Sequence, residues 1–282
     1  MPTPLQLKII ETLNVKKTID PATELRARID STKAFLLNTP MKGYVLGISG
    51  GLDSCLSGYI LQKSCSELKT ETGEDYKFIA MLLPYGIQGD AEDAKTVASF
   101  IGADRVIELN IKPMVDAFTE TYNAAVDGDK LSDFNRGNLK ARARCSAQYA
   151  VGAQNNCLVG GADNSNEALM GYFTLAGDGF FDWCPISGLT KSQETEILRF
   201  VGAPSAILTK KPTADLLDEK PQQADEDELG VTYSQTNAFL TGEDVGKEAT
   251  EIIEQRYLKT EHKRHLPATP FDAWWQEPVI VG

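Results

Sequence analysis

The chain has 282 residues, and its 40 acidic and 28 basic residues give a formal charge of −12 and a sequence pI near 4.7. A basic excess is the electrostatic signature of nonspecific nucleic-acid binding, so this charge argues against a nucleic-acid partner. The composition is that of a globular protein. No apolar run approaches the roughly 18 residues that a membrane span needs, and the first residues have no long uncharged core like that of a signal peptide. We therefore expect a cytoplasmic protein with no membrane partner.

Cysteine and histidine are expected to contribute little to the chemistry. The chain has five cysteines without Cys-x-x-Cys spacing, which predicts reduced, packed thiols rather than a disulfide framework or a structural zinc site. Its two histidines, His262 and His265, have no third His or Cys close by, which argues against a metal site there. Catalysis is therefore expected to depend on carboxylates, lysine, arginine and backbone groups.

The N-terminal third of the chain changes from a helical to a strand-and-helix pattern. The first forty residues predict two helices, LQLKIIETL and PATELRARIDSTKAFLLN, and Asp20 and Pro21 open the second as N-cap and first helical residue. A short apolar run at residues 44–48 then predicts a β-strand. The glycine-rich turn Ser49-Gly50-Gly51 follows and leads into a predicted helix over DSCLSGYILQKSCSEL.

The same alternation of strand and helix continues downstream. It predicts strands at 78–83, 105–111 and 156–160, and helices at 90–101, 112–125 and 138–154. Strands joined by long helices need crossover connections, so the sheet should be mainly parallel with helices on both faces. This is a doubly wound, Rossmann-like α/β fold, in which ligands bind beyond the C-terminal ends of the strands, where the glycine-rich turn falls.

Beyond residue 200 the periodic pattern weakens. The segment PTADLLDEKPQQADEDELG is acidic and punctuated by proline, and its composition alone predicts a solvated loop. A predicted helix at 246–258 and the basic cluster 262–265 follow, and the rings of Trp274 and Trp275 are predicted to pack the tail. Without repeats or low-complexity linkers, we expect one domain over residues 1–282, with an N-terminal helical extension at 1–40 and a C-terminal tail at 259–282.

The strongest local signal is GISGGLDS, which lies between a predicted strand and a predicted helix. Its glycines let the backbone approach a ligand, successive N–H groups form an anion-binding nest, and the following helix directs its positive end to the same place. A Walker loop would continue with Gly-Lys-Ser/Thr, and a dinucleotide fingerprint would read GxGxxG; neither is present. A structural turn would not need Ser49, Asp53 and Ser54, so we interpret the segment as a phosphate-binding loop.

The SGGxDS motif resembles the loop of the N-type ATP pyrophosphatases, enzymes of the adenine-nucleotide alpha-hydrolase-like fold that transfer AMP from ATP to an acceptor. From Gly43 to Trp275 the chain is similar to the ammonia-dependent NAD synthetases, through GYVLGISGGLDS, DFNRGNLKARAR, SGLTKSQ, KPTADLLDEKPQQADEDELG and EHKRHLPATPFDAWW. The resemblance implies ATP-dependent amidation of deamido-NAD by ammonia, through an adenylated intermediate, to NAD, AMP and pyrophosphate. It also implies a homodimer, and an active-site position for the acidic segment instead of a solvated loop.

The resemblance further implies roles for individual residues. It implies magnesium ligands at Asp53 and Glu167, and ATP contacts at Gly47, Ile48, Ser49, Gly50, Gly51, Leu52, Asp53, Ser54, Lys191 and Thr213. It implies deamido-NAD contacts at Arg142, Asp182, His262 and Lys263, and catalytic roles for Lys191 and Asp178, the latter holding ammonium or accepting its proton. One or two carboxylates with substrate phosphates suit magnesium, and arginine and lysine suit a substrate with a carboxylate and a pyrophosphate.

Several of these side chains also have a purely structural interpretation. Local sequence places Glu167 and Lys191 equally well in first helical turns, Thr213 at a helix N-cap, Asp178 in a turn between glycines, and Arg142 on an exposed basic helix face. From the local sequence alone these alternatives stay open.

Three positions depart from the family pattern. Ala162 stands where a threonine near ATP is usual, Leu175 where a lysine contacts the substrate, and Leu82 where many members carry arginine. The two missing cations matter because a hydrogen bond to a charged group is worth about 1.5–3 kcal/mol. One alternative is therefore a nucleotide-binding regulatory protein without full activity.

A second alternative is an N-type ATP pyrophosphatase with another acceptor, such as tRNA. The acidic charge and the cysteine spacing disfavour that acceptor. The nitrogen source is bounded by length, because 282 residues leave no room for a glutaminase domain. We therefore expect free ammonia as the donor.

Overall fold

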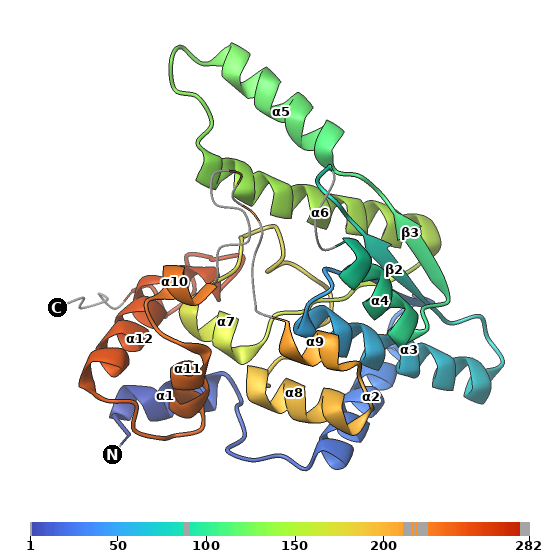
Figure 1. The fold of residues 1–282 in the computed structure, drawn as a ribbon, viewed down its shortest axis with the longest axis horizontal. Coiled ribbons are helices and arrows are strands. Elements are labelled where there is room, and N and C mark those ends of the chain that lie inside the picture. Colours follow the sequence, from blue (N-terminus) through green and yellow to red (C-terminus); the bar gives the residue numbers. More distant parts are fainter. Residues whose placement is uncertain (1, 87–90, 211–215, 217, 219–224, 277–282) are drawn as a thin grey trace.

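The computed structural model describes residues 2–86, 91–210, 216, 218 and 225–276 (Figure 1). Within them, the centre is a four-stranded parallel sheet of order β3-β2-β1-β4. The strands are β1 (Gly43–Gly47), β2 (Lys77–Leu82), β3 (Arg105–Glu108) and β4 (Leu158–Val159). The strand order reverses beside β1, which is the topology of a doubly wound fold. The predicted fold class is thus confirmed.

Helices cover both faces of this sheet (Figure 1). One face carries α2 (Pro21–Leu37), α3 (Leu52–Thr72), α4 (Ala91–Ile101) and α8 (Lys191–Phe200), and the other carries α6 (Asp133–Asn155) and the start of α5 (Lys112–Ala125). In β1, Tyr44 and Leu46 belong to the cluster under α2 and α3, whereas Val45 belongs to the cluster under α6. Both faces of the central strand are therefore buried, which explains its uninterrupted apolar sequence.

A second group of helices packs beside the sheet, around an apolar cluster of its own. It comprises α1 (Pro4–Thr12), α7 (Ser165–Met170), α11 (Tyr233–Leu240) and α12 (Lys247–Lys259). The other short elements are α9 (Ser205–Thr209), α10 (Asp225–Leu229) and the 3₁₀ turn η1 (Glu261–Lys263). The periodic pattern predicts none of α7, α9, α10 and α11, because helices of five to eight residues span too few turns to carry an amphipathic period.

Four predicted boundaries need correction. The helix predicted over DSCLSGYILQKSCSEL continues for four more residues, to the end of α3 at Thr72. The strand predicted at 105–111 ends three residues early, at the end of β3. The strand predicted at 156–160 is reduced to the two residues of β4, because Asn156 adopts a left-handed backbone conformation (φ 55°) that ends α6. The helix predicted at 138–154 begins about one turn earlier, because the Ser132 side chain caps it.

The described N-terminal residues are helical, and the described part of the tail packs through its tryptophan rings. The described part of residues 1–40 forms α1 and α2. In the tail, the Trp274 ring stacks on His265 with centroids 4.7 Å apart, and Trp275 Nε1 donates to the Thr269 carbonyl at 2.9 Å, so these rings pack the tail as predicted. The division into one domain with an extension and a tail stays a prediction. Among the described helices, none is both long and apolar enough to cross a bilayer.

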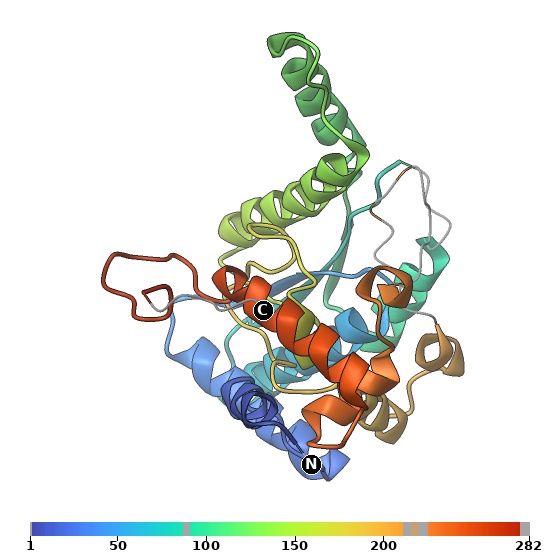
Figure 2. The same cartoon turned by 90° about the vertical axis from the view of Figure 1, so that its left-hand side faces the viewer.

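A helical arm, consisting of α5 and the first turns of α6, projects away from the sheet (Figure 2). Val115 is the one fully buried residue of α5. Met114 and Phe118, by contrast, are 50% and 53% exposed. Apolar side chains of the arm are therefore left uncovered by the rest of the described chain.

Candidate active site

The glycine-rich turn lies at the C-terminal end of β1, where the strand order reverses. Gly50 has φ 80°, and a Cβ atom there would lie 2.8 Å from both Asp93 Cβ and the Ala94 backbone nitrogen, so glycine is required. Gly51 is the N-cap of α3 and provides no side-chain cap, which leaves backbone N–H groups at this helix end available to an anion. The interpretation as a phosphate-binding loop therefore has the required backbone geometry.

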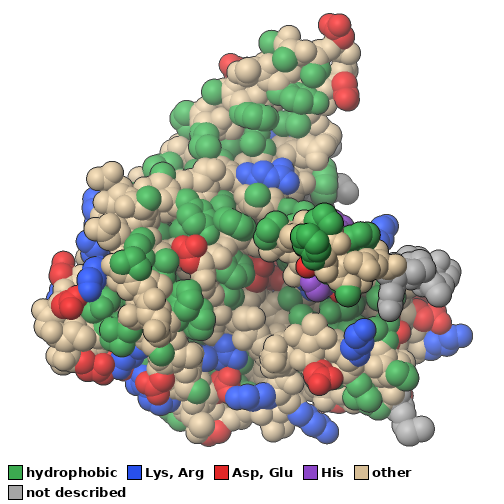
Figure 3. Space-filling model, turned by 180° about the vertical axis from the view of Figure 1, so that it is seen from behind, with side chains coloured by type: hydrophobic (Ala, Val, Ile, Leu, Met, Phe, Trp, Pro, Cys, Tyr) green, Lys and Arg blue, Asp and Glu red, His purple; other side chains and the backbone are tan. Residues whose placement is uncertain are grey.

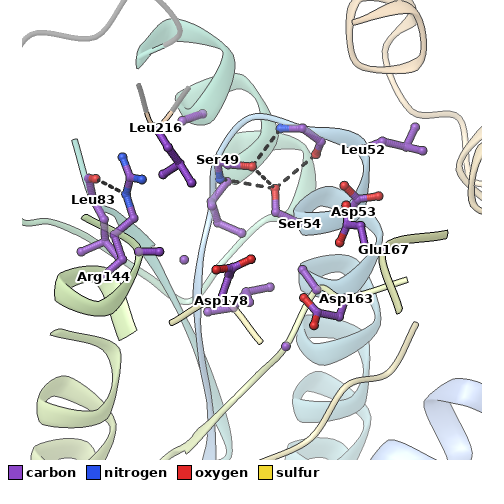
Figure 4. Close-up of a pocket in the computed structure, with 18 of the residues that line it drawn as sticks. Ser49, Leu52, Asp53, Ser54, Leu83, Arg144, Asp163, Glu167, Asp178 and Leu216 are labelled. Atoms are coloured by element: carbon purple, nitrogen blue, oxygen red, sulfur yellow. Dashed lines mark hydrogen bonds between the residues drawn. The ribbon is translucent and has the colours of Figure 1, made fainter. Parts of the chain in front are cut away.

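A cavity of about 1050 Å³ opens at this end of the sheet (Figure 4). The predicted site residues that line it are Gly47, Ile48, Ser49, Gly51, Leu52, Asp53, Ser54, Glu167, Asp178 and Lys191. Gly50 does not line it, because it packs against the start of α4. Two departures from the family pattern, Leu82 and Ala162, lie in the cavity wall. Thr213 lies outside the described residues.

Three charged side chains meet where α3, α7 and α8 begin, and we call them the central cluster: Asp53, Glu167 and Lys191. Lys191 Nζ lies 2.7 Å from both carboxylate oxygens of Asp53 and 3.1 Å from Glu167 Oε1. Glu167 and Lys191 occupy the first turns of α7 and α8, and a capping box at Thr190 fixes the start of α8. The structural and functional interpretations of these two residues are thus compatible.

The pKa values of the central cluster show how strongly its charges depend on one another. Burial would raise the pKa of Asp53, but Lys191 and a hydrogen bond from neutral Glu194 lower it. Burial, aided by Asp53 and opposed by Lys191, raises the pKa of Glu167 to about 7. Burial disfavours the Lys191 ammonium, yet the two carboxylates raise its pKa well above its usual value. The two carboxylates of the central cluster therefore keep the buried Lys191 side chain in its charged form.

Two further carboxyl groups at this centre escape prediction from sequence. Glu194 lies one helical turn after Lys191, is fully buried, and has a pKa raised well above its usual value by burial and by Asp53. Asp163 lines the cavity, and burial followed by the charge of Asp178 raises its pKa. The i, i+3 spacing of Glu194 from Lys191 is the one sequence signal that places them on the same helix face.

Asp178 and Lys263 lie close to each other but differ in access to the cavity. Asp178 lines the cavity and accepts a hydrogen bond from the Thr174 N–H at 3.0 Å. Its partial removal from water disfavours the carboxylate and raises its pKa. Lys263 Nζ donates to the carbonyls of Gly171, at 2.6 Å, and Phe173, and burial lowers its pKa. Of the two, only Asp178 is among the residues that line the cavity.

The other predicted dinucleotide contacts also lie outside the cavity lining. Arg142 is exposed on α6, and its Nε donates to the Leu175 carbonyl at 3.1 Å, so this arginine lies beside the position where a lysine is usual. Asp182 accepts a hydrogen bond from the Val159 N–H at 2.7 Å and supports the end of β4. His262 is exposed. The substrate roles of these residues stay predictions.

This site combines the strand order, the phosphate-binding turn and the central cluster. These are together the features of a nucleotide-binding α/β protein. The family model described as NAD synthase matches residues 24–267. The NH(3)-dependent NAD(+) synthetase of Bacillus pumilus is 49% identical over 272 residues, which cover 96% of this chain and 99% of that protein. The chain therefore belongs to the NAD synthase family.

Solved structures agree with this assignment. The NAD+ synthetase of Burkholderia pseudomallei is 36% identical, with a TM-score of 0.80 over 95% of this chain and 99% of that one. The NMN synthetase of Francisella tularensis is 32% identical, with a TM-score of 0.78 over 90% of this chain and 100% of that one.

Proposed function

We propose that this chain makes NAD+ from deamido-NAD and ammonia by first transferring AMP from ATP to the nicotinate carboxylate. NH3-dependent NAD+ synthesis is the activity of relatives that match the chain over nearly its whole length. The observation that carries the adenylation step is the juxtaposition of the phosphate-binding turn with the central cluster in one cavity. A phosphate chain bound there meets both backbone N–H groups and a buried ammonium.

The two chemical steps balance without any further reactant. A nicotinate oxygen attacks the α-phosphorus of ATP, and pyrophosphate leaves. Ammonia then attacks the acyl carbon and loses a proton, and AMP leaves with the oxygen that had attacked phosphorus. Negative charge develops on phosphate and carbonyl oxygens, so fixed cations and backbone N–H groups stabilise both transition states. In our proposal the turn at Ser49–Gly51 holds the departing pyrophosphate, and Lys191 neutralises its charge.

Magnesium is the metal that fits the central cluster. Asp53 and Glu167 are hard oxygen donors beside the phosphate-binding turn, and Mg²⁺ commonly takes one or two carboxylates together with substrate phosphates. Over the described part of the chain, no group of three or more His, Cys, Asp and Glu side chains is arranged to hold a metal alone. We infer that ATP brings the remaining ligands, and that Mg²⁺ when bound supplies Lewis-acid stabilisation of phosphate charge.

Asp178 is our candidate for managing the proton of ammonia. Its carboxylate lines the cavity, and its raised pKa makes it a better proton acceptor than an ordinary aspartate. The predicted dinucleotide contacts Arg142, Asp182, His262 and Lys263 would then bind parts of the substrate outside the cavity.

The exposed apolar side chains of the arm support a homodimer. Five large apolar side chains in β3, in the segment after it and in the arm are 37–62% exposed: Val106, Leu109, Met114, Phe118 and Phe134. The space-filling view shows apolar side chains gathered along the projecting arm (Figure 3). Several large apolar side chains exposed on one projecting arm are typical of an interaction site, and we propose a second copy of the chain as its occupant. Light scattering should give twice the mass of one chain, and a monomeric mass across the working concentration range would contradict the proposal.

We also propose a cytoplasmic location, which cell fractionation tests.

The activity is tested by incubating the protein with deamido-NAD, ATP, Mg²⁺ and ammonium. We expect NAD+, AMP and pyrophosphate in equal amounts. A parallel reaction with nicotinic acid mononucleotide measures whether the acceptor resembles that of the NMN synthetase. Greater kcat/KM for the mononucleotide would overturn the proposed substrate, and ATP binding without AMP release would favour the regulatory alternative.

A further inference from the structure

We propose that Asn164 is a positioning residue that fixes Asp53 relative to Glu167, an inference that rests on the function proposed above. Asn164 is the N-cap of α7 and is 1% exposed. It is not one of the residues that line the cavity, so it acts through its neighbours. Both predicted magnesium ligands are among those neighbours.

Each end of the Asn164 carboxamide contacts a different helix. Its Oδ1 accepts hydrogen bonds from the N–H groups of Asn166, at 2.9 Å, and Glu167, at 3.1 Å, which sets the start of α7. Its Nδ2 donates to Asp53 Oδ1 at 3.1 Å, across a sequence separation of 111 residues. One planar group thus joins the first turn of α7 to the first turn of α3.

Among the side chains that cap helices well, only asparagine can make this connection. Aspartate, serine and threonine can accept the N–H bonds of α7. Ionised aspartate has no proton to donate to Asp53 and would add a negative charge beside it. Serine can donate, but its hydroxyl is shorter than a carboxamide. The backbone donors around Oδ1 fix which end of the amide is oxygen, so Nδ2 must face the carboxylate.

The connection matters most when Lys191 turns toward ligand phosphates. In the described state Asp53 Oδ1 is held by two donors, Lys191 Nζ at 2.7 Å and Asn164 Nδ2. If the lysine moves to a phosphate, Asn164 keeps the Asp53 carboxylate in the same orientation. A ligand that must be held by both carboxylates then meets a preorganised pair, which reduces the cost of ordering on binding.

The test compares two variants of Asn164 with a matched control. Asn164→Asp keeps the cap but loses the donor to Asp53 and adds a charge. Asn164→Ser shortens the group without adding a charge. The control is Asn110→Asp, because Asn110 Oδ1 also accepts two backbone N–H bonds, from Gly86 at 3.1 Å and Lys112 at 2.9 Å, while its side chain is exposed and its acceptor bonds survive the change.

Calorimetry with Mg·ATP, and melting temperature without ligand, separate positioning from stability. For Asn164→Asp we expect the dissociation constant of Mg·ATP to rise on the order of tenfold or more, since a hydrogen bond to a charged group is lost. The rise should be smaller for Asn164→Ser and absent for Asn110→Asp. The KM for ATP should rise more than the KM for deamido-NAD.

Two results would overturn the inference. One is an Asn164→Asp protein that binds Mg·ATP as tightly as the parent protein. The other is a pair of Asn164 variants that melt at lower temperature but bind Mg·ATP unchanged once folded, which is the behaviour of a purely structural cap. If the parent protein binds Mg·ATP but makes no NAD+, the proposed function fails, whereas weakened binding by Asn164→Asp would still support the positioning role.

Discussion

The central cluster and the charged residues of the arm contain the same kinds of side chain in different surroundings. In the central cluster, the side chains of Lys191, Asp53 and Glu167 are 9%, 21% and 17% exposed. In the arm cluster, which we define as Arg136 and Asp116 of the arm together with Asp218, a residue outside the arm that pairs with Arg136, the corresponding values are 30%, 29% and 40%. The charged side chains of the arm cluster are therefore more exposed to solvent than those of the central cluster.

The difference in burial changes what each charge is worth. Removing one partner from a buried pair leaves an uncompensated charge and typically costs about 3–5 kcal/mol. Exposed pairs are worth about 0.2–1 kcal/mol, because water screens them in both the folded and unfolded states. We infer that the central cluster is arranged to bind a ligand, whereas the arm cluster joins α5 to α6 and joins α6 to Asp218.

The largest effect is expected for Asp53→Asn. The substitution removes one carboxylate from the cluster that we propose binds Mg²⁺, so AMP release should be abolished. The amide is close in size to the carboxylate, so the far-UV circular dichroism should be unchanged. An AMP assay with Mg·ATP and deamido-NAD checks this, and full AMP release by a folded variant would disprove the magnesium assignment.

Lys191→Met should lower kcat by roughly 10²–10³-fold, the usual cost of losing one preorganised group that stabilises transition-state charge. The matched control is Lys69→Met, because Lys69 also bonds an aspartate, Asp75, at 2.9 Å, but on the protein surface. The control should keep its kcat. Equal kcat values for the two variants would mean that burial gives the lysine no special role.

The pH dependence of ligand binding should be set by Glu167. Its pKa is raised to about 7, so it is protonated below that pH and Mg·ATP must compete with the proton. The affinity should approach a tenfold loss per pH unit below about 7 and level off above it. Calorimetry across this range provides the test, with Glu167→Gln as the control that lacks the dependence. A flat profile for the parent protein would contradict the raised pKa.

The smallest effect is expected in the arm cluster. Hydrogen bonds from Lys112 and Tyr85 lower the pKa of Asp116 to about 2. Its contribution to stability is therefore present above its unfolded pKa near 3.8 and is lost as the pH falls through 2. At neutral pH, Asp116→Asn should change the free energy of unfolding by about 1 kcal/mol or less, without affecting kcat. Urea denaturation measures this, and a loss of several kcal/mol would contradict the contrast between the clusters.

How far the sequence predicts the fold depends on the length of each element. The strand at β1 and the long helices α2, α3 and α12 are visible as apolar runs or capped segments. Helices α9 and α10, of five residues each, are not, because tertiary contacts rather than periodicity decide whether such short segments are helical.

The sequence likewise predicts some residues of the candidate site and not others. Asp53 belongs to the recognisable SGGxDS motif, and the similarity to family segments predicts Glu167 and Lys191. The sequence does not predict Asn164 and Glu194, because their importance lies in contacts with Asp53 that join distant parts of the chain. A local sequence motif therefore identifies residues that contact a ligand more readily than residues that position those ligand-contacting side chains.

The adenylation of the nicotinate carboxylate is tested most directly with deamido-NAD labelled by ¹⁸O in that carboxylate. Because the attacking oxygen leaves with AMP in the second step, mass spectrometry should find one ¹⁸O atom in AMP for each NAD+ formed, and none in pyrophosphate. Unlabelled AMP, or ADP and orthophosphate as products, would contradict the account.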